Sequence, residues 1–469
     1  MTAYIRLGLV LAGLGFSTVA AAQTPGATDW PTAGYNAART STNNADTTIG
    51  AANAATLKPA WTVSVDGSAI TAQAIVATGI ATAAGRRDLV FVGTEHGTNA
   101  ALDAATGATV WSVNTGFNHV RCQDLPNGDY GITAAAAFDR PSGTLYAMGG
   151  DGKLYAYAAG TGAVRPGWPV TVVADPAVEH VYGALNVVNG GVYVITASMC
   201  DQGTYHGRIV RVATVNPSIT NRLYIDGTVT DANGNITHAG PGGGGDWGSA
   251  GVSVDPAGYV YTATGNVFTN PENKFYGNHI LKMLPDLSVV SQASPPHGCA
   301  TCDHDFSATP VVYQAAGCKP ELAVLNKDGH VYVYRSAPLS AKPLQSLLND
   351  AMVGDVAYDP VTQTLISANL NGIHAYTVGT SCLTHRKWVE PGISAPGTRH
   401  GFAVSPPTIA NGVVYYVNGE AATVLAFDLD TGRRLWAATL GALAFAQPTV
   451  AGGALIVSAW DGKVYAFRP

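Results

Sequence analysis

A short unit made of a turn and a strand recurs along this chain of 469 residues. Its clearest copies are DGKLYAY at 151–157, DGHVYVY at 328–334 and DGKVYAF at 461–467. A related unit ends in a Thr-Gly turn followed by Trp, as in ALDAATGATVW at 101–111 and AFDLDTGRRLW at 426–436. Short apolar strands of alternating polarity precede these units, separated by Gly, Asp and Asn turns. Such internal repetition is typical of one structural module copied many times.

The spacing of these modules predicts the fold class. Modules of four short strands recur roughly every 40–55 residues, which is the signature of a β-propeller. About eight modules can be counted, starting near residues 70, 131, 183, 248, 306, 352, 403 and 444. We therefore expect an all-β, eight-bladed β-propeller of four-stranded antiparallel blades. Trp111 and Trp436, which end the repeat, are expected to pack between blades.

The two ends of the chain suggest how the ring closes. The last module stops at Pro469 without its Thr-Gly-x-x-x-Trp strand. The segment LKPAWTVSV at 57–65 has the character of that strand and has no partner strands before it. We expect this N-terminal strand to complete the last blade, because closure removes open sheet edges.

The N-terminus predicts export. Residues 1–22 combine Arg6, an apolar stretch and Ala20-Ala21-Ala22, the pattern of a cleavable signal peptide. No later run is long and apolar enough to span a bilayer. We expect a single propeller domain over residues 23–469, periplasmic or secreted. Only 12% of residues are charged and the net charge is −6, so nucleic acid is not an expected partner.

The six cysteines favour disulfides, because an even number in an exported chain usually pairs. Sequence does not fix the pairing; the simplest choice is a local Cys299–Cys302 bridge with Cys122–Cys200 and Cys318–Cys382 between neighbouring modules. The motif HGCATCDH leaves two further interpretations. Covalent haem is not expected, since Asp303 rather than His follows the second Cys. A zinc site using His297 and His304 is open but lacks separated ligand pairs.

Chemistry-bearing side chains concentrate in residues 242–335, each beside the end of an expected strand. They are Trp247, Asn266, Asp303, Asp305 and Lys327. Trp gives a stacking face, Asn and Asp give oxygen ligands for a hard cation, and Lys gives a positive point charge. That set suits a flat, anionic cofactor. The alternative is structural: a blade-packing Trp, with Asn, the two Asp and Lys as turn residues.

The motifs GGGGDWGSAGVSVDPAGYVYTATGN, DHDFSATP and NKDG carry a family resemblance, as do DWPTAGYNAARTS and LKPAW near the N-terminus. From Trp30 to the end, the chain resembles the pyrroloquinoline-quinone (PQQ) dependent alcohol dehydrogenase propellers. It looks closer to the polyvinyl-alcohol-dehydrogenase-like members than to the long methanol dehydrogenases.

The resemblance implies a role for each residue of this set. Trp247 matches the floor beneath the quinone, and Asn266 matches a calcium ligand. Asp305 matches the catalytic base beside the cation, and Lys327 matches the cation near the quinone oxygens. Asp303 is either an alternative base or a further contact to the cation and cofactor.

Two features depart from the family pattern. The loop expected to carry a Glu ligand reads MCDQGTYHG, so either Asp201 replaces that ligand or the metal is absent. The adjacent Cys pair above the quinone is missing, with Cys122 followed by Gln123, and the family Arg nearby corresponds to Gly128.

The resemblance implies a dehydrogenase that oxidises a small or polymeric alcohol by hydride transfer to PQQ, with Ca²⁺. Electrons would pass to a separate carrier such as a cytochrome c, because the chain has no haem motif. The alternative is a non-catalytic propeller of the same repeat class, serving as an envelope scaffold or protein-binding module. A sugar-binding propeller would need exposed aromatic residues at repeated loop positions, whereas the Tyr residues are scattered.

Overall fold

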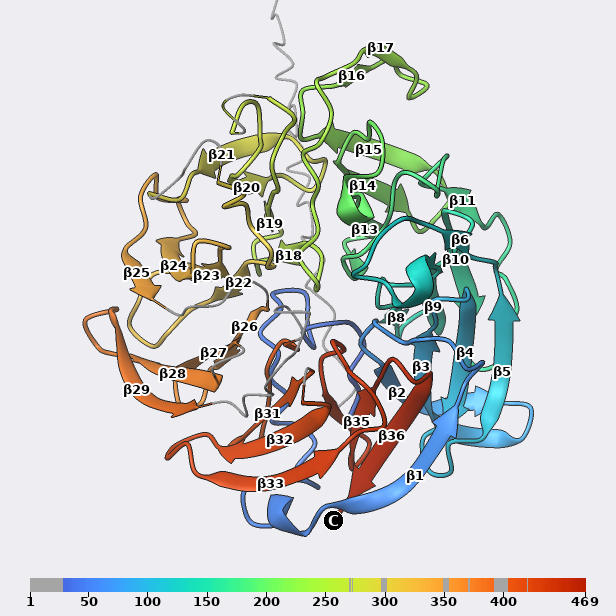
Figure 1. Ribbon diagram of the computed structural model, residues 1–469, viewed down its shortest axis with the longest axis vertical. Helices are drawn as coiled ribbons and strands as arrows, with labels where there is room; N and C mark the ends of the chain where they lie inside the picture. The colour runs from blue at the N-terminus through green and yellow to red at the C-terminus, as the bar shows by residue number, and fades with distance from the viewer. Residues whose placement is uncertain are drawn as a thin grey trace, which may run out of the picture.

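The computed structural model describes residues 28–269, 271, 273–296, 302–348, 354–369, 372–391, 404–419 and 421–469. Within these residues, eight four-stranded antiparallel sheets stand around a common axis as the blades of a propeller (Figure 1). The sequence prediction of an all-β, eight-bladed propeller is confirmed. The first strand of each blade lies nearest the axis and the fourth lies at the rim.

Seven blades are formed by four consecutive strands. The first four of these blades, in chain order, contain β2 (Ile75–Thr82), β3 (Gly85–Gly93), β4 (Thr98–Asp103) and β5 (Thr109–Asn114); β8 (Ala137–Asp139), β9 (Thr144–Met148), β10 (Lys153–Ala158) and β11 (Val170–Thr171); β12 (Asn186–Val188), β13 (Gly191–Ile195), β14 (Arg208–Ala213) and β15 (Ile219–Tyr224); β18 (Ser253–Val254), β19 (Val260–Ala263), β20 (Ile280–Met283) and β21 (Val289–Ala293). The next three contain β22 (Val311–Tyr313), β23 (Glu321–Leu325), β24 (His330–Arg335) and β25 (Gln345–Leu348); β26 (Val356–Asp359), β27 (Thr364–Asn369), β28 (Gly372–Val378) and β29 (Thr384–Pro391); β30 (Thr408–Ala410), β31 (Val413–Asn418), β32 (Thr423–Asp428) and β33 (Arg434–Thr439).

The eighth blade joins the two ends of the chain. It contains β34 (Thr449–Ala451), β35 (Ala454–Ser458) and β36 (Lys463–Arg468), and its outer strand is β1 (Lys58–Ser64). β1 runs antiparallel to β36, with Lys58 opposite Arg468 and Ser64 opposite Lys463. The prediction that an N-terminal strand closes the ring is therefore confirmed.

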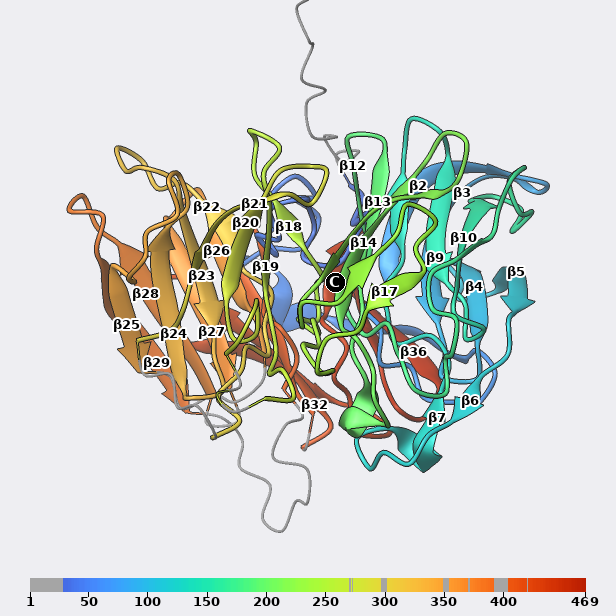
Figure 2. The same cartoon turned by 90° about the horizontal axis from the view of Figure 1, so that it is seen from above.

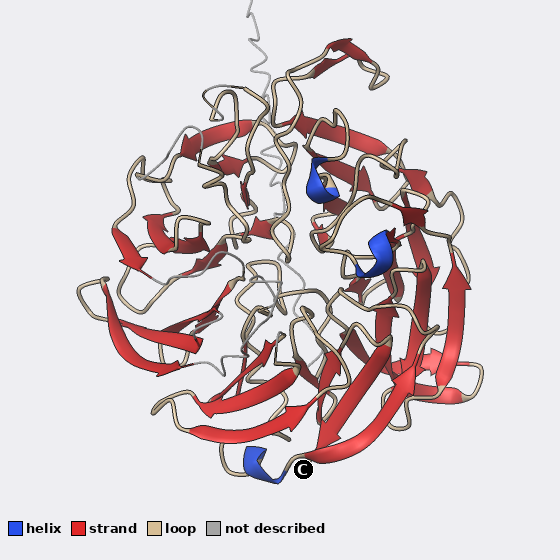
Figure 3. Cartoon of the chain, in the orientation of Figure 1, coloured by secondary structure: helices blue, strands red, loops and turns tan. Residues whose placement is uncertain are grey.

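Few other elements interrupt the blades (Figure 3). Two small hairpins are formed by β6 (Asn118–His119) with β7 (Asp129–Tyr130), and by β16 (Val229–Thr230) with β17 (Ile236–His238). Three short 3-10 turns are η1 (Ala54–Thr56), η2 (Pro126–Gly128) and η3 (Met199–Asp201). No helix among the described residues is long and apolar enough to cross a membrane.

The Thr-Gly turn and the Trp of the repeat fasten neighbouring blades to each other. Trp111 is buried, and its indole N–H donates to the carbonyl of Ala159 at 2.7 Å. A Cβ on Gly162, in the Thr-Gly turn of the next blade, would lie 2.7 Å from the indole ring. Glycine allows both this close approach and the left-handed φ of +71°. Gly107 over Trp61 and Gly432 over Trp388 repeat the contact.

Two of the three predicted disulfides lie within the described residues, and both form. Cys122 pairs with Cys200, and Cys318 pairs with Cys382. Cys318–Cys382 joins loops of two neighbouring blades, whereas Cys122–Cys200 joins the segment between the first two blades to the β13–β14 loop of the third. Cys299 and residues 1–22, predicted to be a signal peptide, lie outside the described residues.

Candidate functional site

The irregular segments between blades gather at one end of the central channel, called the loop end below. Figure 2 shows the β6–β7 hairpin and η3 on this side of the ring. The residues that lead into the first strands of two consecutive blades also meet here. Trp247 lies upstream of β18, and Asp305 lies upstream of β22. Asn266 follows β19 and Lys327 follows β23.

Backbone hydrogen bonds hold these segments together within each blade, and Phe306 N–H donates to the carbonyl of Thr264 at 3.4 Å from one blade to the other. Gly265 N–H donates to the carbonyl of Gly245 at 2.6 Å, and Lys327 N–H donates to that of Asp305 at 3.1 Å. The structure therefore brings together four residues that lie far apart in sequence. A fifth predicted residue, Asp303, contacts two of them through its side chain.

Glycine at position 265 makes this assembly possible. A Cβ there would lie 2.7 Å from the carbonyl oxygen of Gly245, 2.8 Å from Asp305 Oδ2 and 3.3 Å from Trp247 Nε1. Any side chain would therefore push against the acid and the indole together. The Gly run before Trp247 has a separate reason, because Gly242, Gly243 and Gly244 all adopt left-handed φ values.

The side chains form a connected polar set. Lys327 Nζ lies 2.6 Å from Asp305 Oδ1 and 3.0 Å from Asp303 Oδ1. Trp247 Nε1–H donates to Asp305 Oδ2 at 3.1 Å. Asn266 Nδ2 donates to Asp303 Oδ1 at 2.9 Å. Lys327 Nζ also lies 4.8 Å from the centre of the Trp247 ring, within the range of a cation–π contact.

Burial sets the electrostatics of the central ion pair. The side chains of Asp305 and Lys327 are 7% and 15% exposed, whereas that of Asp303 is 69% exposed. Burial raises the pKa of Asp305 to about 6, and the Lys327 ammonium and Trp247 N–H limit the rise. Burial lowers the pKa of Lys327, but the two carboxylates outweigh it and the pKa is raised overall. At neutral pH the pair is an ionised acid beside an ionised amine.

One oxygen in the set has no partner, and it bears on cation binding. Asn266 Oδ1 is buried without a hydrogen-bond partner, although its Nδ2 is bonded. Buried polar atoms are nearly always satisfied, so an orphan oxygen needs an explanation. An amide oxygen beside carboxylates is a donor set that Ca²⁺ accepts. The half-buried indole of Trp247 offers a stacking face next to it. The residues present therefore fit both a calcium ion and a flat quinone.

Asp201, predicted as a further metal ligand, is placed differently from the other residues. It is exposed at the end of η3, and its Oδ1 accepts a hydrogen bond from the Tyr205 hydroxyl at 2.9 Å. Among the described residues, its carboxylate forms no close group with those of Asp303 and Asp305. Tyr205 is buried, and a Cβ on Gly245 would lie 3.1 Å from its hydroxyl. Asp201 is thus connected to the site through the Tyr205 hydroxyl, which donates to Asp201 and lies beside Gly245.

Sequence reasoning missed Tyr205 and Asp246. Tyr205 follows Asp201 by four residues in MCDQGTYHG, and this spacing was the available signal. Asp246, directly before Trp247, is only 1% exposed and accepts a hydrogen bond from Thr262 Oγ1 at 2.5 Å. Its other oxygen has no partner, and burial raises its pKa to about 7. An acid next to the Trp of the Gly run could have been singled out.

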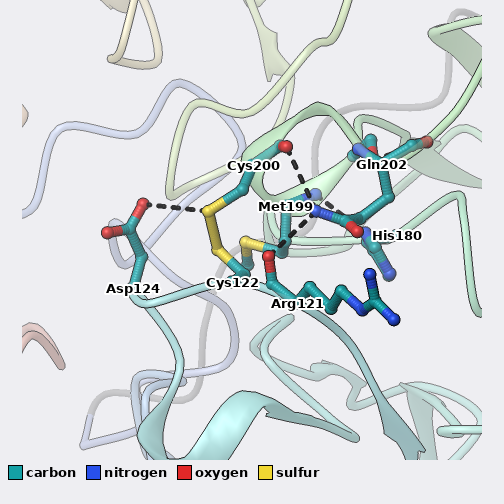
Figure 4. The surroundings of a disulfide bond; sticks show 8 residues. Arg121, Cys122, Asp124, His180, Met199, Cys200 and Gln202 are labelled. Carbon is teal, nitrogen blue, oxygen red and sulfur yellow. Dashed lines mark hydrogen bonds between the residues drawn. A yellow bond between two sulfur atoms is a disulfide. The ribbon is translucent and has the colours of Figure 1, made fainter.

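The Cys122–Cys200 disulfide holds η3 against the loop that precedes η2 (Figure 4). Gln202 supports this link, because its side-chain amide donates to the carbonyl of Arg121 at 3.1 Å. Asp124 lies next to the sulfurs, 3.7 Å from Cys200 Sγ. This close group is not a metal site, since both sulfurs are consumed by the disulfide.

Comparisons with known proteins agree with this architecture. Residues 30–183 match the family described as glucose/ethanol/alcohol dehydrogenase, beta-propeller domain. Residues 354–469 match the family described as outer membrane protein assembly factor BamB. No curated protein matches the chain significantly in sequence.

Solved structures resemble the whole ring. A quinohemoprotein alcohol dehydrogenase from Comamonas testosteroni is similar with a TM-score of 0.69 and 15% identity, over 94% of this chain and 80% of that one. A europium-containing methanol dehydrogenase is similar with a TM-score of 0.70 and 17% identity, over 95% and 98% of the two chains. BamB from Moraxella catarrhalis is similar with a TM-score of 0.58 and 14% identity, over 88% and 100%.

These matches define the class of protein. The chain is a β-propeller of the quinoprotein alcohol dehydrogenase type in fold, and the predicted resemblance is confirmed at that level. At such identities the likeness to solved structures shows the fold alone. The closer resemblance to polyvinyl-alcohol-dehydrogenase-like members stays a prediction.

Proposed function

We propose that this protein is a quinoprotein dehydrogenase that oxidises an alcohol, with PQQ and Ca²⁺ bound at the loop end of the channel. The meeting of Trp247, Asp305 and Lys327 beside the partnerless oxygen of Asn266 carries the proposal. A propeller that serves only as a scaffold has no need for an ionised pair buried at the channel mouth, because such a pair costs desolvation energy.

Each residue has a distinct part in binding. Trp247 supports the flat ring, and Asn266 and Asp305 hold the cation. Asp201 is linked to the site through Tyr205 and is proposed as a further ligand, which requires its bond to Tyr205 to rearrange. Lys327 and Asp303 contact the polar edge of the cofactor. When bound, PQQ supplies the hydride acceptor and Ca²⁺ polarises it.

Asp305 acts as the general base toward the alcohol. Its pKa of about 6 keeps it ionised at neutral pH while leaving it more basic than an exposed carboxylate. Trp247 fixes the orientation of Oδ2, and Lys327 stabilises the charged form. After transfer, the substrate hydroxyl proton resides on the Asp305 carboxylate, next to solvent-exposed Asp303.

The partners follow from the site and the sequence. The alcohol, small or polymeric, approaches from the loop end, and electrons pass to a separate carrier such as a cytochrome c. The signal sequence of residues 1–22 and the two disulfides between modules favour a periplasmic or secreted protein.

A scaffold function is the second candidate, and the match of residues 354–469 to the BamB family favours it. Calorimetric titration of the metal-free protein with PQQ, with and without Ca²⁺, separates the two. We expect binding that requires Ca²⁺, that Trp247→Ala abolishes and that Trp436→Phe, at a blade-packing Trp, leaves intact. Asp305→Asn should retain quinone binding and lose turnover. No binding in either titration would refute the cofactor site and leave the scaffold function.

A further inference from the structure

The channel end opposite the loop end is crossed by residues 28–46, called the belt below. Figure 1 shows this blue segment in the middle of the ring, and Figure 2 shows it on the side opposite the β6–β7 hairpin. The belt belongs to none of the blade sheets. It curls because Gly34, Tyr35, Arg39 and Ser41 adopt left-handed φ values between 56° and 72°.

The belt bonds to the first strand of every blade, or to the residue next to it, in the order of the ring. Most of these hydrogen bonds involve backbone groups on both sides. In chain order they are Val76 N to Trp30 O (2.9 Å), Phe138 N to Pro31 O (2.7 Å), Thr32 Oγ1 to Leu185 O (2.8 Å), Val254 N to Ala37 O (2.7 Å), Val312 N to Ala38 O (3.0 Å), Tyr358 N to Thr40 O (2.9 Å), Ile409 N to Ser41 O (2.9 Å) and Asn43 Nδ2 to Val450 O (3.0 Å).

Arg39 fastens the middle of the belt. Its side chain is 1% exposed and donates to the carbonyls of Leu185 (3.0 Å), Val252 (3.0 Å) and Ala33 (2.5 Å), and to Thr32 Oγ1 (2.7 Å). Burial lowers its pKa to about 9, so it remains charged at neutral pH. A buried guanidinium bound to carbonyl dipoles pulls two blades and the belt together.

The belt also forms the floor of the channel. Ala33 packs in a buried alanine cluster with one residue from each of four blades. Next to it lies a small pocket, lined in part by Ser249 and Ser307. These serines follow Trp247 and Asp305 by two residues. The channel is therefore blocked on the side away from the candidate site.

We propose that this end of the ring is a binding site for an extended peptide, filled by the chain's own belt, which can leave and return without unpairing any blade. Backbone N–H groups of the blades recognise mainly backbone carbonyls of the belt. The site also encloses the side chains of Trp30 and Arg39, which are both fully buried. The residues that join the belt to β1 include exposed Ala51 and Ala52. Loss of the belt breaks the bonds above and leaves all eight four-stranded ladders intact. Such a segment opens as one cooperative unit below global unfolding.

Native-state hydrogen exchange on the intact protein tests the proposal. The diagnostic amides belong to Phe138, Val254, Val312, Tyr358 and Ile409, which all donate to the belt. We expect one common rate for the five, faster than that of amides inside the blade ladders. Exchange of these five only at the rate of global unfolding, or at five unrelated rates, would overturn the proposal.

Two variants separate the belt from general stability. Arg39→Met should speed exchange of all five amides together by about tenfold or more, since hydrogen bonds to a charged group are lost. Arg165→Met removes guanidinium bonds to the carbonyls of Ser142 and Gly143 on a single blade and should leave the five unchanged. If Arg39→Met does not fold, the wild-type exchange rates still decide.

A cut chain tests whether the site binds a peptide. A protease site placed between Ala51 and Ala52 severs the belt while keeping both pieces present. The cut belt should stay bound through gel filtration and exchange with a labelled peptide of residues 28–46. A peptide with Arg39→Met should compete about tenfold or more less well. Loss of the belt on cutting, or no exchange short of unfolding, would contradict the assignment.

Discussion

Replacement of Lys327 by Met should raise the pKa of Asp305 well above neutrality. The Lys327 ammonium lies 2.6 Å from Asp305 Oδ1, and both side chains are largely buried. An opposite charge at this distance typically lowers a carboxyl pKa by about 1–3 units. Starting from a pKa of about 6, we expect a value near 8 once the amine is gone. The shift of about 2 units corresponds to about 3 kcal/mol between the two protonation states.

Trp247 reports this titration directly, because its Nε1–H donates to Asp305 Oδ2. The fluorescence of Trp247 in the metal-free protein is obtained by subtracting the spectrum of the matching Trp247→Phe protein. The midpoint of the pH titration should move from about 6 in the wild type to about 8 in Lys327→Met. Lys153→Met is the matched control, since it removes a similar ion pair with Asp151 (2.8 Å) and should not move the midpoint.

The same shift predicts an activity change in the proposed enzyme. At pH 7 a base with a pKa of about 6 is roughly 90% ionised, and one with a pKa of about 8 is roughly 10% ionised. Turnover should fall at pH 7, and raising the pH should recover part of this loss. A fluorescence midpoint that stays near 6 in Lys327→Met would refute the electrostatic reasoning, whatever happens to turnover.

Three further perturbations address neighbouring features. Burial raises the pKa of Asp246 from 3.8 to about 7, so the folded state loses stability as pH rises through this range. In urea unfolding, the stability of Asp246→Asn relative to the wild type should rise by up to about 3 kcal/mol between pH 5 and pH 8, and an equal difference at both pH values would contradict this. Gly265→Ala should lower the free energy of unfolding by about 1–3 kcal/mol and change the emission of the adjacent indole. Gly379→Ala, where a Cβ has room, should do neither. A Gly265→Ala protein as stable as the wild type would mean that the close contacts relax freely. Replacing Cys318 and Cys382 by Ser opens a link across 64 residues and should cost about 4 kcal/mol, so an unchanged melting temperature in calorimetry would show that the link constrains little.

Much of the architecture could be predicted because it repeats. Alternating strands and Thr-Gly turns recur at each blade, and the missing last strand pointed to residues 57–65 as its replacement. The pairing of Cys122 with Cys200 was the simplest choice among alternatives that the sequence left open, and the structure contains it. The belt carried no such signal. Its bonds use backbone carbonyls and bend at Tyr35, Arg39 and Ser41, and no side-chain period encodes this path.

The candidate site was predictable to a different extent. Trp247, Asn266, Asp305 and Lys327 were selected by their chemistry beside expected strand ends, and the family resemblance assigned their roles. The structure brings them together because the start of one strand and the end of its antiparallel neighbour lie at the same end of a blade. The contact of Asp201 with Tyr205 depends on how a short 3-10 turn folds back, which a local sequence pattern does not specify.

The two ends of the channel are connected through the same strands, which leads to a last prediction. An identical seven-residue step separates Trp247 from Val254 and Asp305 from Val312, and both valines donate to the belt. Arg39 contacts the carbonyl of Val252 within the first of these steps. Loosening the belt should therefore free the approaches to β18 and β22 and weaken the bond between the indole and the acid.

We expect Arg39→Met to broaden the difference fluorescence of Trp247 and shift its emission toward that of a solvated indole. The Arg165 side chain bonds to another blade, so Arg165→Met should leave the emission unchanged. If Arg39→Met speeds exchange at Val254 and Val312 while the Trp247 spectrum stays that of the wild type, the two ends are mechanically independent. In that case the site is held by the bonds within each of its own two blades, above all Gly265 to Gly245 and Lys327 to Asp305.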